Sequence, residues 1–227
     1  MKISLVIPTK NEGLTIGDVI KSARSFVDEI IVIDGYSSDN TLDIARSLLG
    51  ADRVFLQKTK RGGKGAALRD AIGIVSGDVI VFMDADGSHE AEDIPRLVEP
   101  ILKDEADMVI ASRTKGGSDE AFMTIEGMIR HTGGYIATMI INYRWGASLT
   151  EVENGFRAVR TSSIKKLNLV SDDFEIEQEM IIKALKKNMR VTEIGSHEYA
   201  RKAGESKLPT GKAWRFVWHL IKEMVTD

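Results

Sequence analysis

The 227-residue sequence contains no cysteine, few aromatic residues (6%) and only four prolines, and its charges nearly balance. Without cysteine, the chain can form neither a disulfide nor a thiolate metal site, which fits a reducing compartment such as the cytoplasm. The net charge of −3 gives no electrostatic reason to expect nucleic-acid binding. No uninterrupted apolar run approaches about 18 residues, so we expect no membrane-spanning helix. The apolar run at residues 3–7 is too short for a signal peptide and predicts a strand.

The first 115 residues alternate between apolar runs and segments with helical spacing. The runs predict strands near residues 2–8, 28–35, 52–58, 77–87 and 106–113, and the segments between them predict helices near 14–26, 38–49, 63–75 and 91–104. Continuously apolar strands that alternate with helices predict an α/β fold, in which helices cover both faces of a mostly parallel sheet. Ligands of such sheets bind at the carboxyl ends of the strands.

The later half is more helical. Residues 121–146 predict a long helix loosened at Gly133–Gly134, and residues 174–188 predict another helix. Strands are expected near 155–161 and 190–200, and an amphipathic helix closes the chain near 212–225. There is no repeat and no Pro/Gly/Ser-rich linker, so we expect one domain over residues 1–227.

The stretch VIVFMDADGSHE, residues 79–90, carries two aspartates directly after an apolar strand. Residues i and i+2 of a strand point the same way, so Asp84 and Asp86 can converge on one hard cation such as Mg²⁺ or Mn²⁺. Such a cation removes the repulsion between the two carboxylates and holds substrate phosphates. The alternative is a polar loop in which Asp86 caps a turn.

Other strand ends carry weaker motifs. Glu12 in PTKNE and Asp34 in IDGYSSDNT could hydrogen-bond a nucleoside, or each could belong to a turn and helix cap. The segment KRGGKGAAL offers basic and backbone N–H groups for an anion, but it is not the G-x-x-x-x-G-K-[ST] phosphate loop, and a solvated basic loop is the preferred interpretation. Basic residues that could meet phosphates around the aspartates are Arg113, Arg130, Arg201 and Lys207.

Eight motifs run in order through almost the whole chain: PTKNE, IDGYSSDNT, GKGAALRDAI, MDADGSHE, IASR, GFRAVR, EQEMIIKALKKNMRVTEI and RKAGESK. Together they resemble family 2 glycosyltransferases, most closely the dolichyl-phosphate mannose and glucose synthases. The resemblance implies a GT-A nucleotide-sugar fold with a bound Mg²⁺ or Mn²⁺. It implies inverting transfer of one hexose from a GDP-mannose or UDP-glucose type donor to a polyprenyl phosphate. Residues 1–115 would form the donor and metal half, and residues 116–227 the acceptor side.

The resemblance also implies roles for individual residues. The donor site would contain Pro8, Lys10, Glu12, Ile33, Asp34 and Ala85. The metal would be held by Asp84, Asp86 and, as a further ligand, Ser88. Donor or acceptor phosphates would bind Arg113, Arg201 and Lys207, and the acceptor phosphate would bind Arg130. On this basis Asp84, Asp86 and Arg113 are the predicted catalytic residues.

The sequence departs from the family pattern at three places. Gly35 stands where a second adjacent aspartate is usual, which leaves the choice of nucleotide open. Lys10 replaces an aromatic residue in the first motif. EVENGFR, residues 151–157, replaces a stretch usually like DPTSGFR, which leaves the acceptor open.

Two kinds of acceptor make different chemical demands. A phosphate monoester is already anionic and needs cationic positioning, whereas a hydroxyl must lose a proton to a general base. Glu151 or Glu153 could be that base, so a hydroxyl acceptor remains an alternative. The Q-x-x-R-W motif of processive polysaccharide synthases is absent. A nucleotide-sugar pyrophosphorylase is one rival class, but it would need a glycine-rich triphosphate loop near the first strand, and PTKNEG is not one. A non-catalytic binding subunit is another rival class, which the loss of Asp84 or Asp86 would have favoured, and both residues are present.

The closing helix carries an apolar stripe at Trp214, Val217, Trp218, Ile221 and Val225. One interpretation is a helix packed on the domain, and the other is an interfacial helix that brings the site to a lipid surface. The second interpretation predicts peripheral contact at the cytoplasmic face of a membrane. Homo-oligomer formation stays open.

Overall fold

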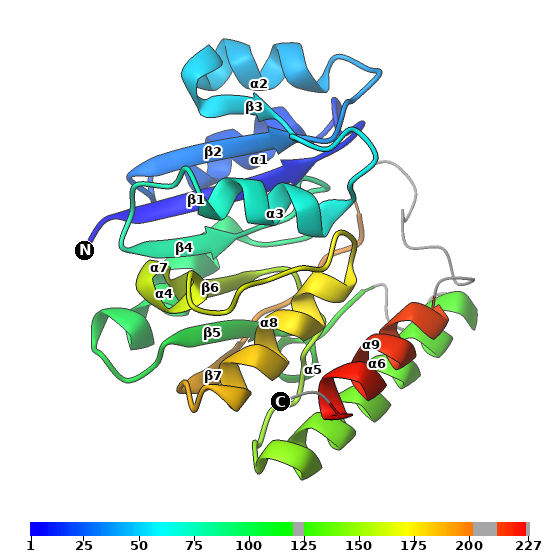
Figure 1. The fold of residues 1–227 in the computed structure, drawn as a ribbon. Coiled ribbons are helices and arrows are strands. Elements are labelled where there is room, and N and C mark those ends of the chain that lie inside the picture. The colour runs from blue at the N-terminus through cyan, green and yellow to red at the C-terminus, as the bar shows by residue number, and fades with distance from the viewer. Residues whose placement is uncertain (120–124, 202–212, 226–227) are drawn as a thin grey trace.

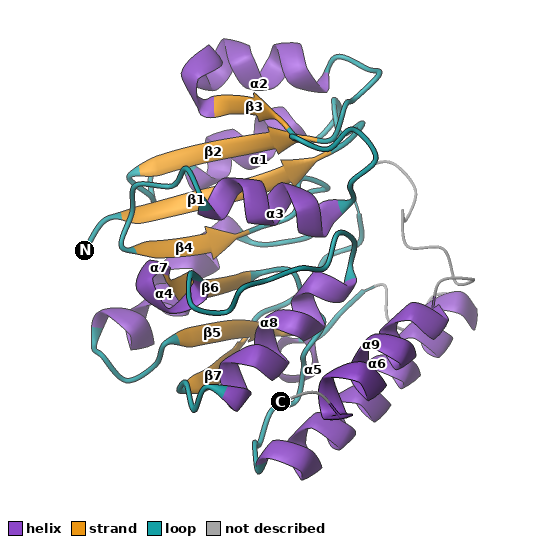
Figure 2. Cartoon of the chain, in the orientation of Figure 1, coloured by secondary structure: helices purple, strands orange, loops and turns teal. Residues whose placement is uncertain are grey.

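In a computed structural model, which describes residues 1–119, 125–201 and 213–225, the chain folds around a seven-stranded sheet with helices on both faces (Figure 1, Figure 2). The strand order is β3-β2-β1-β4-β6-β5-β7, and β6 alone runs antiparallel to its two neighbours. The mostly parallel α/β sheet expected from the sequence is therefore confirmed. The strands are β1 Ile3–Thr9, β2 Glu29–Asp34, β3 Val54–Leu56, β4 Val79–Phe82, β5 Met108–Ser112, β6 Arg157–Arg160 and β7 Val191–Gly195.

The helices form two layers, each with its own apolar core. They are α1 Ile16–Ala23, α2 Thr41–Leu49, α3 Lys64–Ile72, α4 Ile94–Leu102, α5 Arg113–Gly116, α6 Ile125–Trp145, α7 Thr161–Ile164, α8 Glu175–Lys186 and α9 Ala213–Val225, with 3₁₀ turns η1 Ala51–Arg53 and η2 Ala91–Asp93. One core joins the sheet to α1, α2 and α4, and the other joins it to α3, α6, α8 and α9.

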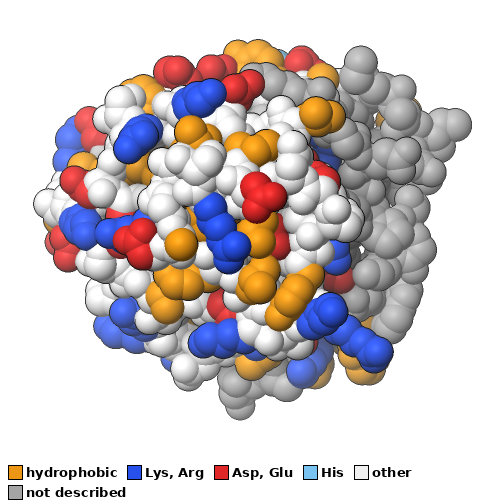
Figure 3. All heavy atoms as spheres, turned by 90° about the horizontal axis from the view of Figure 1, so that it is seen from above, with side chains coloured by type: hydrophobic (Ala, Val, Ile, Leu, Met, Phe, Trp, Pro, Cys, Tyr) orange, Lys and Arg blue, Asp and Glu red, His pale blue; other side chains and the backbone are white. Residues whose placement is uncertain are grey.

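The strand periodicity explains how one sheet supplies both cores. In β1, Leu5 and Ile7 pack into the first core, while Val6 between them packs into the second. All three side chains are fully buried, as expected for a strand covered on both faces. Charges of both signs are interspersed on the face seen in Figure 3, in keeping with the small net charge.

The carboxyl ends of β1, β4 and β5 lie at one edge of the sheet, because these strands run in the same direction. The antiparallel β6 begins at that edge, so the loop before it, residues 146–156, also arrives there. Strands from both halves of the chain therefore contribute to one sheet and to one edge.

One helix differs from the prediction, and the structure shows which side of another helix is packed. Residues 133 and 134 lie inside a continuous α6, so the predicted loosening is wrong. Two glycines cost helix stability, but packing of α6 on the second core offsets that cost. In α9, the packed side chains are Leu220 and Met224, whereas the predicted stripe is exposed, with Trp218 62% exposed. The side chain of Trp214 lies outside the described part.

None of the helices in the described ranges is both long and apolar enough to cross a membrane.

Candidate active site

A pocket of about 650 Å³ opens at the carboxyl ends of the strands. Its wall includes eight of the residues predicted from the sequence: Pro8, Lys10, Glu12, Asp84, Ala85, Asp86, Arg113 and Arg201. Ile33, Asp34 and Ser88 lie close by but do not form the wall. Arg130 belongs to α6, with its side chain outside the described part, and Lys207 lies outside the described residues. The individual roles of all these residues remain predictions.

Asp84 follows β4 and meets a buried lysine from the start of α3. Lys64 Nζ lies 2.6 Å from Asp84 Oδ1 and 2.7 Å from Glu177 Oε1 of α8. Burial opposes ionisation of Asp84, but the charge and hydrogen bond of Lys64, together with the nearby His89 ring, whose Nε2 lies 3.6 Å from Asp84 Oδ2, outweigh it and hold the Asp84 pKa well below its usual range. The pKa of Lys64 is raised in turn, because the two carboxylates outweigh the effect of its burial. Asp84 is therefore ionised throughout the neutral range.

Asp86 is held by a turn that places it beside a second cation. The Ser88 hydroxyl and backbone N–H both donate to Asp86 Oδ1, at 2.7 and 3.1 Å. Gly87 between them has a φ of +75°, a conformation that favours glycine and lets the chain turn directly after the aspartate. Arg201 Nη2 lies 3.1 Å from Asp86 Oδ2. The turn predicted as the alternative is thus present, and it still presents Asp86 to the pocket.

The two aspartates suit a hard divalent cation. No group of three or more metal-binding side chains occurs within the described ranges. However, Mg²⁺ is commonly held by one or two carboxylates together with substrate phosphates, so a pair is sufficient. In this structure, each aspartate instead has a basic side chain within 3.1 Å. The pair therefore fits a cation that also binds phosphate oxygens.

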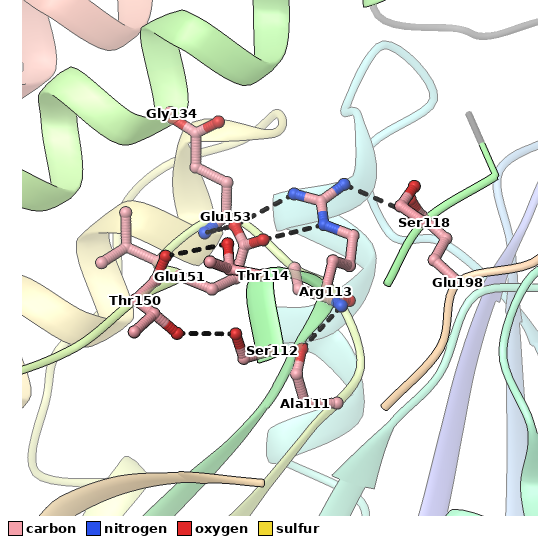
Figure 4. A network of polar contacts seen from close by, with 12 residues as sticks. Ala111, Ser112, Arg113, Thr114, Ser118, Gly134, Thr150, Glu151, Glu153 and Glu198 are labelled. Atoms are coloured by element: carbon pink, nitrogen blue, oxygen red, sulfur yellow. Dashed lines mark hydrogen bonds and ion pairs between the residues drawn. The ribbon is translucent and has the colours of Figure 1, made fainter. Parts of the chain in front are cut away.

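Arg113, directly after β5, is held by glutamates from two other segments (Figure 4). Its Nε and Nη2 donate to the two carboxylate oxygens of Glu151 at 2.8 and 3.0 Å, and Nη1 donates to Glu198 at 3.3 Å. Burial opposes the charge of Arg113, but Glu151 more than offsets it and raises the guanidinium pKa further. The predicted phosphate-binding arginine therefore reaches the pocket with acidic partners.

The loop before β6 is shaped by buried polar contacts. The Arg157 side chain is only 1% exposed, and it donates to the carbonyl oxygens of Val152, Asn154 and Glu177. Asn154 donates to the Ala111 carbonyl oxygen at 2.7 Å and accepts from the Phe156 N–H at 2.9 Å. These bonds fix residues 151–155 against the end of β5 and the pocket.

Glu12 and Asp34, which were predicted to bind the nucleoside, also form hydrogen bonds that stabilise local turns. The Glu12 N–H donates to Thr41 Oγ1 at 2.8 Å, which ties the end of β1 to the start of α2. Asp34 is buried and accepts from the Ser37 N–H and hydroxyl at 2.9 and 2.6 Å. Gly35, the departure from the family pattern, is itself part of the pocket wall.

Sequence reasoning did not identify Glu177 as part of the site or Arg157 as the residue that supports its loop, and it named Lys64 only as a weak candidate for binding an anion. Lys64 was expected in a solvated basic loop, yet its side chain is 12% exposed. A clue was available in the acidic run EIEQE of α8, because acids on an otherwise apolar buried helix need partners. The partner, however, comes from 113 residues earlier in the chain, and only the packing of α3 on α8 brings the two together.

Comparison with known proteins agrees with the motif resemblance. The family model described as Glycosyl transferase family 2 matches residues 4–167. An undecaprenyl-phosphate mannosyltransferase of Micrococcus luteus is 31% identical, with 93% of this chain and 89% of the relative covered. A dolichol-phosphate mannosyltransferase of Pyrococcus furiosus is also 31% identical over 99% of this chain, which spans 64% of the length of that relative.

Solved structures support the same fold. Glucosyl-3-phosphoglycerate synthase from Mycobacterium tuberculosis, in complex with Mn²⁺, uridine diphosphate and phosphoglyceric acid, superposes with a TM-score of 0.77 at 22% identity. The match covers all of this chain and 79% of that one, and it identifies the fold as GT-A. The chain therefore belongs to glycosyl transferase family 2 and is a glycosyltransferase.

Proposed function

We propose that the protein transfers a single hexose from a nucleoside diphosphate sugar of the GDP-mannose or UDP-glucose type to a polyprenyl phosphate, with inversion at the anomeric carbon. The observation that carries the proposal is the pocket in which Asp84 and Asp86 lie among the basic groups Lys64, Arg113 and Arg201. Two relatives named for transfer to polyprenyl phosphates, at 31% identity, support the choice of acceptor.

The reaction would be one in-line displacement. A phosphate oxygen of the lipid forms a bond to the anomeric carbon, while the bond from that carbon to the diphosphate oxygen breaks. The nucleoside diphosphate leaves with the bonding electron pair. The attacking phosphate is already anionic, so no general base is required.

The chain's own residues would supply charge and position. Lys64, Arg113 and Arg201 belong to the pocket wall, where they would neutralise the negative charge that grows on the departing diphosphate or hold the acceptor phosphate. Asp84 and Asp86 would hold Mg²⁺ or Mn²⁺, which supplies further charge neutralisation when bound. A hydroxyl acceptor is the second candidate, favoured by one observation: burial raises the pKa of Glu153, a carboxyl of the pocket wall, to about 7.

Access to a lipid acceptor would come from peripheral contact with a membrane. α6 and α9 pack side by side beyond the sheet (Figure 1). Both carry exposed apolar side chains: Ile136, Met139 and Tyr143 on α6, and Val217, Trp218, Ile221 and Val225 on α9. Such side chains are typical of helices that lie in the interface plane of a bilayer.

Thermal unfolding with a panel of nucleotide sugars, each with and without Mn²⁺, tests the donor side. A donor at a hundredfold excess over its Kd adds about 2.7 kcal/mol, equivalent to roughly 5 °C or more for a chain of this size. We expect that shift with GDP-mannose or UDP-glucose, only when Mn²⁺ is present, and not in Asp84→Asn. An equal shift without metal, or in the variant, would contradict the assigned metal site.

A further inference from the structure

Glu153 occupies an unusual place in the pocket wall. It lies in the loop before β6, and its carboxylate approaches α6 at Gly134, where a Cβ atom would come within 3.1 Å of Glu153 Oε2 (Figure 4). Its backbone N–H donates to Glu151 Oε1 at 3.1 Å. Within the described part of the chain, the Glu153 carboxylate itself has neither an ion pair nor a hydrogen-bond donor. It therefore lines the pocket with no fixed partner among the residues that the structure describes.

Glu153 has acidic and basic neighbours from several elements of the fold. Glu151 of its own loop and Glu177 of α8 are acidic, while Arg113 at the start of α5 and Arg157 of β6 are basic. His131 of α6 lines the same pocket. Arg113 forms ion pairs with Glu151 and Glu198, and Arg157 donates hydrogen bonds to backbone carbonyl oxygens. Neither guanidinium group therefore forms an ion pair with Glu153.

These surroundings favour the neutral carboxylic acid. Burial, followed by the charge of Glu151, raises the pKa of Glu153 from 4.5 to about 7. Below that pH the side chain carries a proton, and above it the proton is lost. Glu153 is also one of the positions at which this sequence departs from the family pattern. A role for its carboxyl group is therefore not implied by the resemblance and has to be argued from this chain.

The charges around Arg113 determine whether this part of the pocket attracts or repels an anionic acceptor. Arg113 contributes one positive charge, and its partners Glu151 and Glu198 contribute two negative charges. An ionised Glu153 would add a further negative charge beside this group and repel a phosphate. A protonated Glu153 removes that charge and offers an O–H donor, and hydrogen bonds to charged oxygens are roughly twice as strong as neutral ones.

We propose that Glu153 binds the acceptor as a protonated acid, donating a hydrogen bond from its carboxyl group to a phosphate oxygen of the acceptor beside Arg113. The proposal rests on the proposed function, because it requires a phosphate acceptor. Acceptor binding then stabilises the protonated form, so above pH 7 the protein takes up a proton when the acceptor binds. Glu153 is in this role a binding and specificity residue, and the bond-forming step needs no proton transfer from it.

A different role would have a different signature. If the acceptor were a hydroxyl, Glu153 could act in its ionised form as the general base that removes the hydroxyl proton. Activity would then rise with pH through about 7, and loss of the carboxylate would lower kcat by on the order of 10²–10⁴-fold. The protonated donor predicts the opposite trend, a loss of acceptor affinity as the pH rises.

The test is calorimetric binding of geranyl phosphate, a short soluble prenyl phosphate, to the full chain between pH 6 and 9. Titrations at pH 8 in two buffers with different ionisation enthalpies give the number of protons taken up. We expect close to one more proton in the wild type than in Glu153→Gln, whose amide donates without titrating. Wild-type affinity should fall by up to tenfold per pH unit above pH 7, and the fall should flatten in Glu153→Gln.

Two further variants complete the design. Glu153→Ala removes the donor and should weaken binding about tenfold at pH 6, where the wild type is protonated. Glu99→Gln, at an exposed acid on α4 outside the pocket wall, controls for handling and should match the wild-type proton count. Protonation of the phosphate itself contributes equally to the wild type and to Glu153→Gln, so their difference isolates Glu153.

The remaining outcomes would overturn the proposal. If the wild type binds geranyl phosphate and transfers hexose to it with the same proton uptake as Glu153→Gln, the role of Glu153 is wrong while the proposed function stands. If the wild type binds no prenyl phosphate at any pH, both fail. If transfer goes to a hydroxyl and Glu153→Gln lowers kcat by two orders of magnitude, Glu153 is a base.

Discussion

Lys64 lies between two carboxylates, Asp84 of the pocket wall and Glu177 of the buried α8. At the scale of single residues, this contact connects stability with function. Replacing Lys64 by methionine keeps the apolar stem but removes the cation that the two acids share, and breaking a buried pair costs about 3 kcal/mol or more. We expect Lys64→Met to lower the free energy of unfolding by about that amount in urea titrations.

The matched control is Lys58→Met in the preceding loop. Lys58 is 76% exposed, and its Nζ lies 3.9 Å from Asp70, so its loss should change stability by at most about 0.5 kcal/mol. Equal effects of the two substitutions would show that the Lys64 pair does not stabilise the fold.

The lowered pKa of Glu29 leads to a prediction of how the free energy of unfolding depends on pH. Burial opposes its ionisation, but hydrogen bonds from Ser4, Ser76 and Arg53 outweigh that and lower its pKa from 4.5 to about 2. A lowered pKa stabilises the fold fully above pH 4.5, and this stabilisation is lost as the pH falls toward 2. In urea titrations, the wild type should therefore lose about 2–3 kcal/mol more than Glu29→Gln over that interval. Parallel pH curves for the two proteins would contradict the assignment.

Strand ends and their aspartates were predictable from the sequence, because an apolar run that stops at polar residues is a local pattern. The partners of those aspartates were not. Lys64 and Glu177 meet through packing of α3 on α8, and a solvated loop lysine has the same sequence pattern as a buried one. Long-range ion pairs of this kind depend on tertiary structure alone.

At the scale of elements, α6 contains a matched pair of glycines. A Cβ at Gly133 would meet nothing within 4 Å, whereas one at Gly134 would lie 3.1 Å from Glu153 Oε2. Alanine stabilises a helix by about 1 kcal/mol relative to glycine. Gly133→Ala should gain about that much in thermal or urea unfolding, while Gly134→Ala should gain less or lose stability. Equal gains would mean that Glu153 does not approach the helix as described.

The outward orientation of the apolar stripe on α9 gives a second prediction at this scale. Trp218 and Ile221 are 62% and 48% exposed, so Trp218→Ser with Ile221→Ser should leave the core intact. If α9 contacts a lipid surface, this double variant should bind anionic phospholipid vesicles at least tenfold more weakly in sedimentation assays. The single variant Leu56→Ser, at an exposed leucine of β3, should bind as the wild type does.

Vesicle binding that is unchanged in the double variant would contradict membrane contact through α9. The periodicity of this helix was evident in the sequence, but not which apolar residues pack. Leu220 and Met224 fall beside the stripe and contact the core, because α8 and α6 meet α9 on that side.

For the whole molecule, the sequence was enough to predict the α/β sheet and the edge at which the site lies. Alternating apolar runs and helices specify that topology through local patterns. The antiparallel β6 was predicted as a strand without a direction. Its direction brings residues 151–155 to the same edge as Asp84, and so places Glu151 and Glu153 in the pocket.

The most direct measurement is transfer itself. The protein is incubated with GDP-mannose or UDP-glucose labelled in the hexose, a polyprenyl phosphate in detergent, and Mn²⁺, and the anomeric configuration of the product is read by NMR. We predict a labelled lipid-phosphate hexose of inverted configuration, with a rate that falls at least a hundredfold in EDTA and in Asp84→Asn. Transfer that needs no metal, retains configuration or goes only to a hydroxyl acceptor would contradict the account.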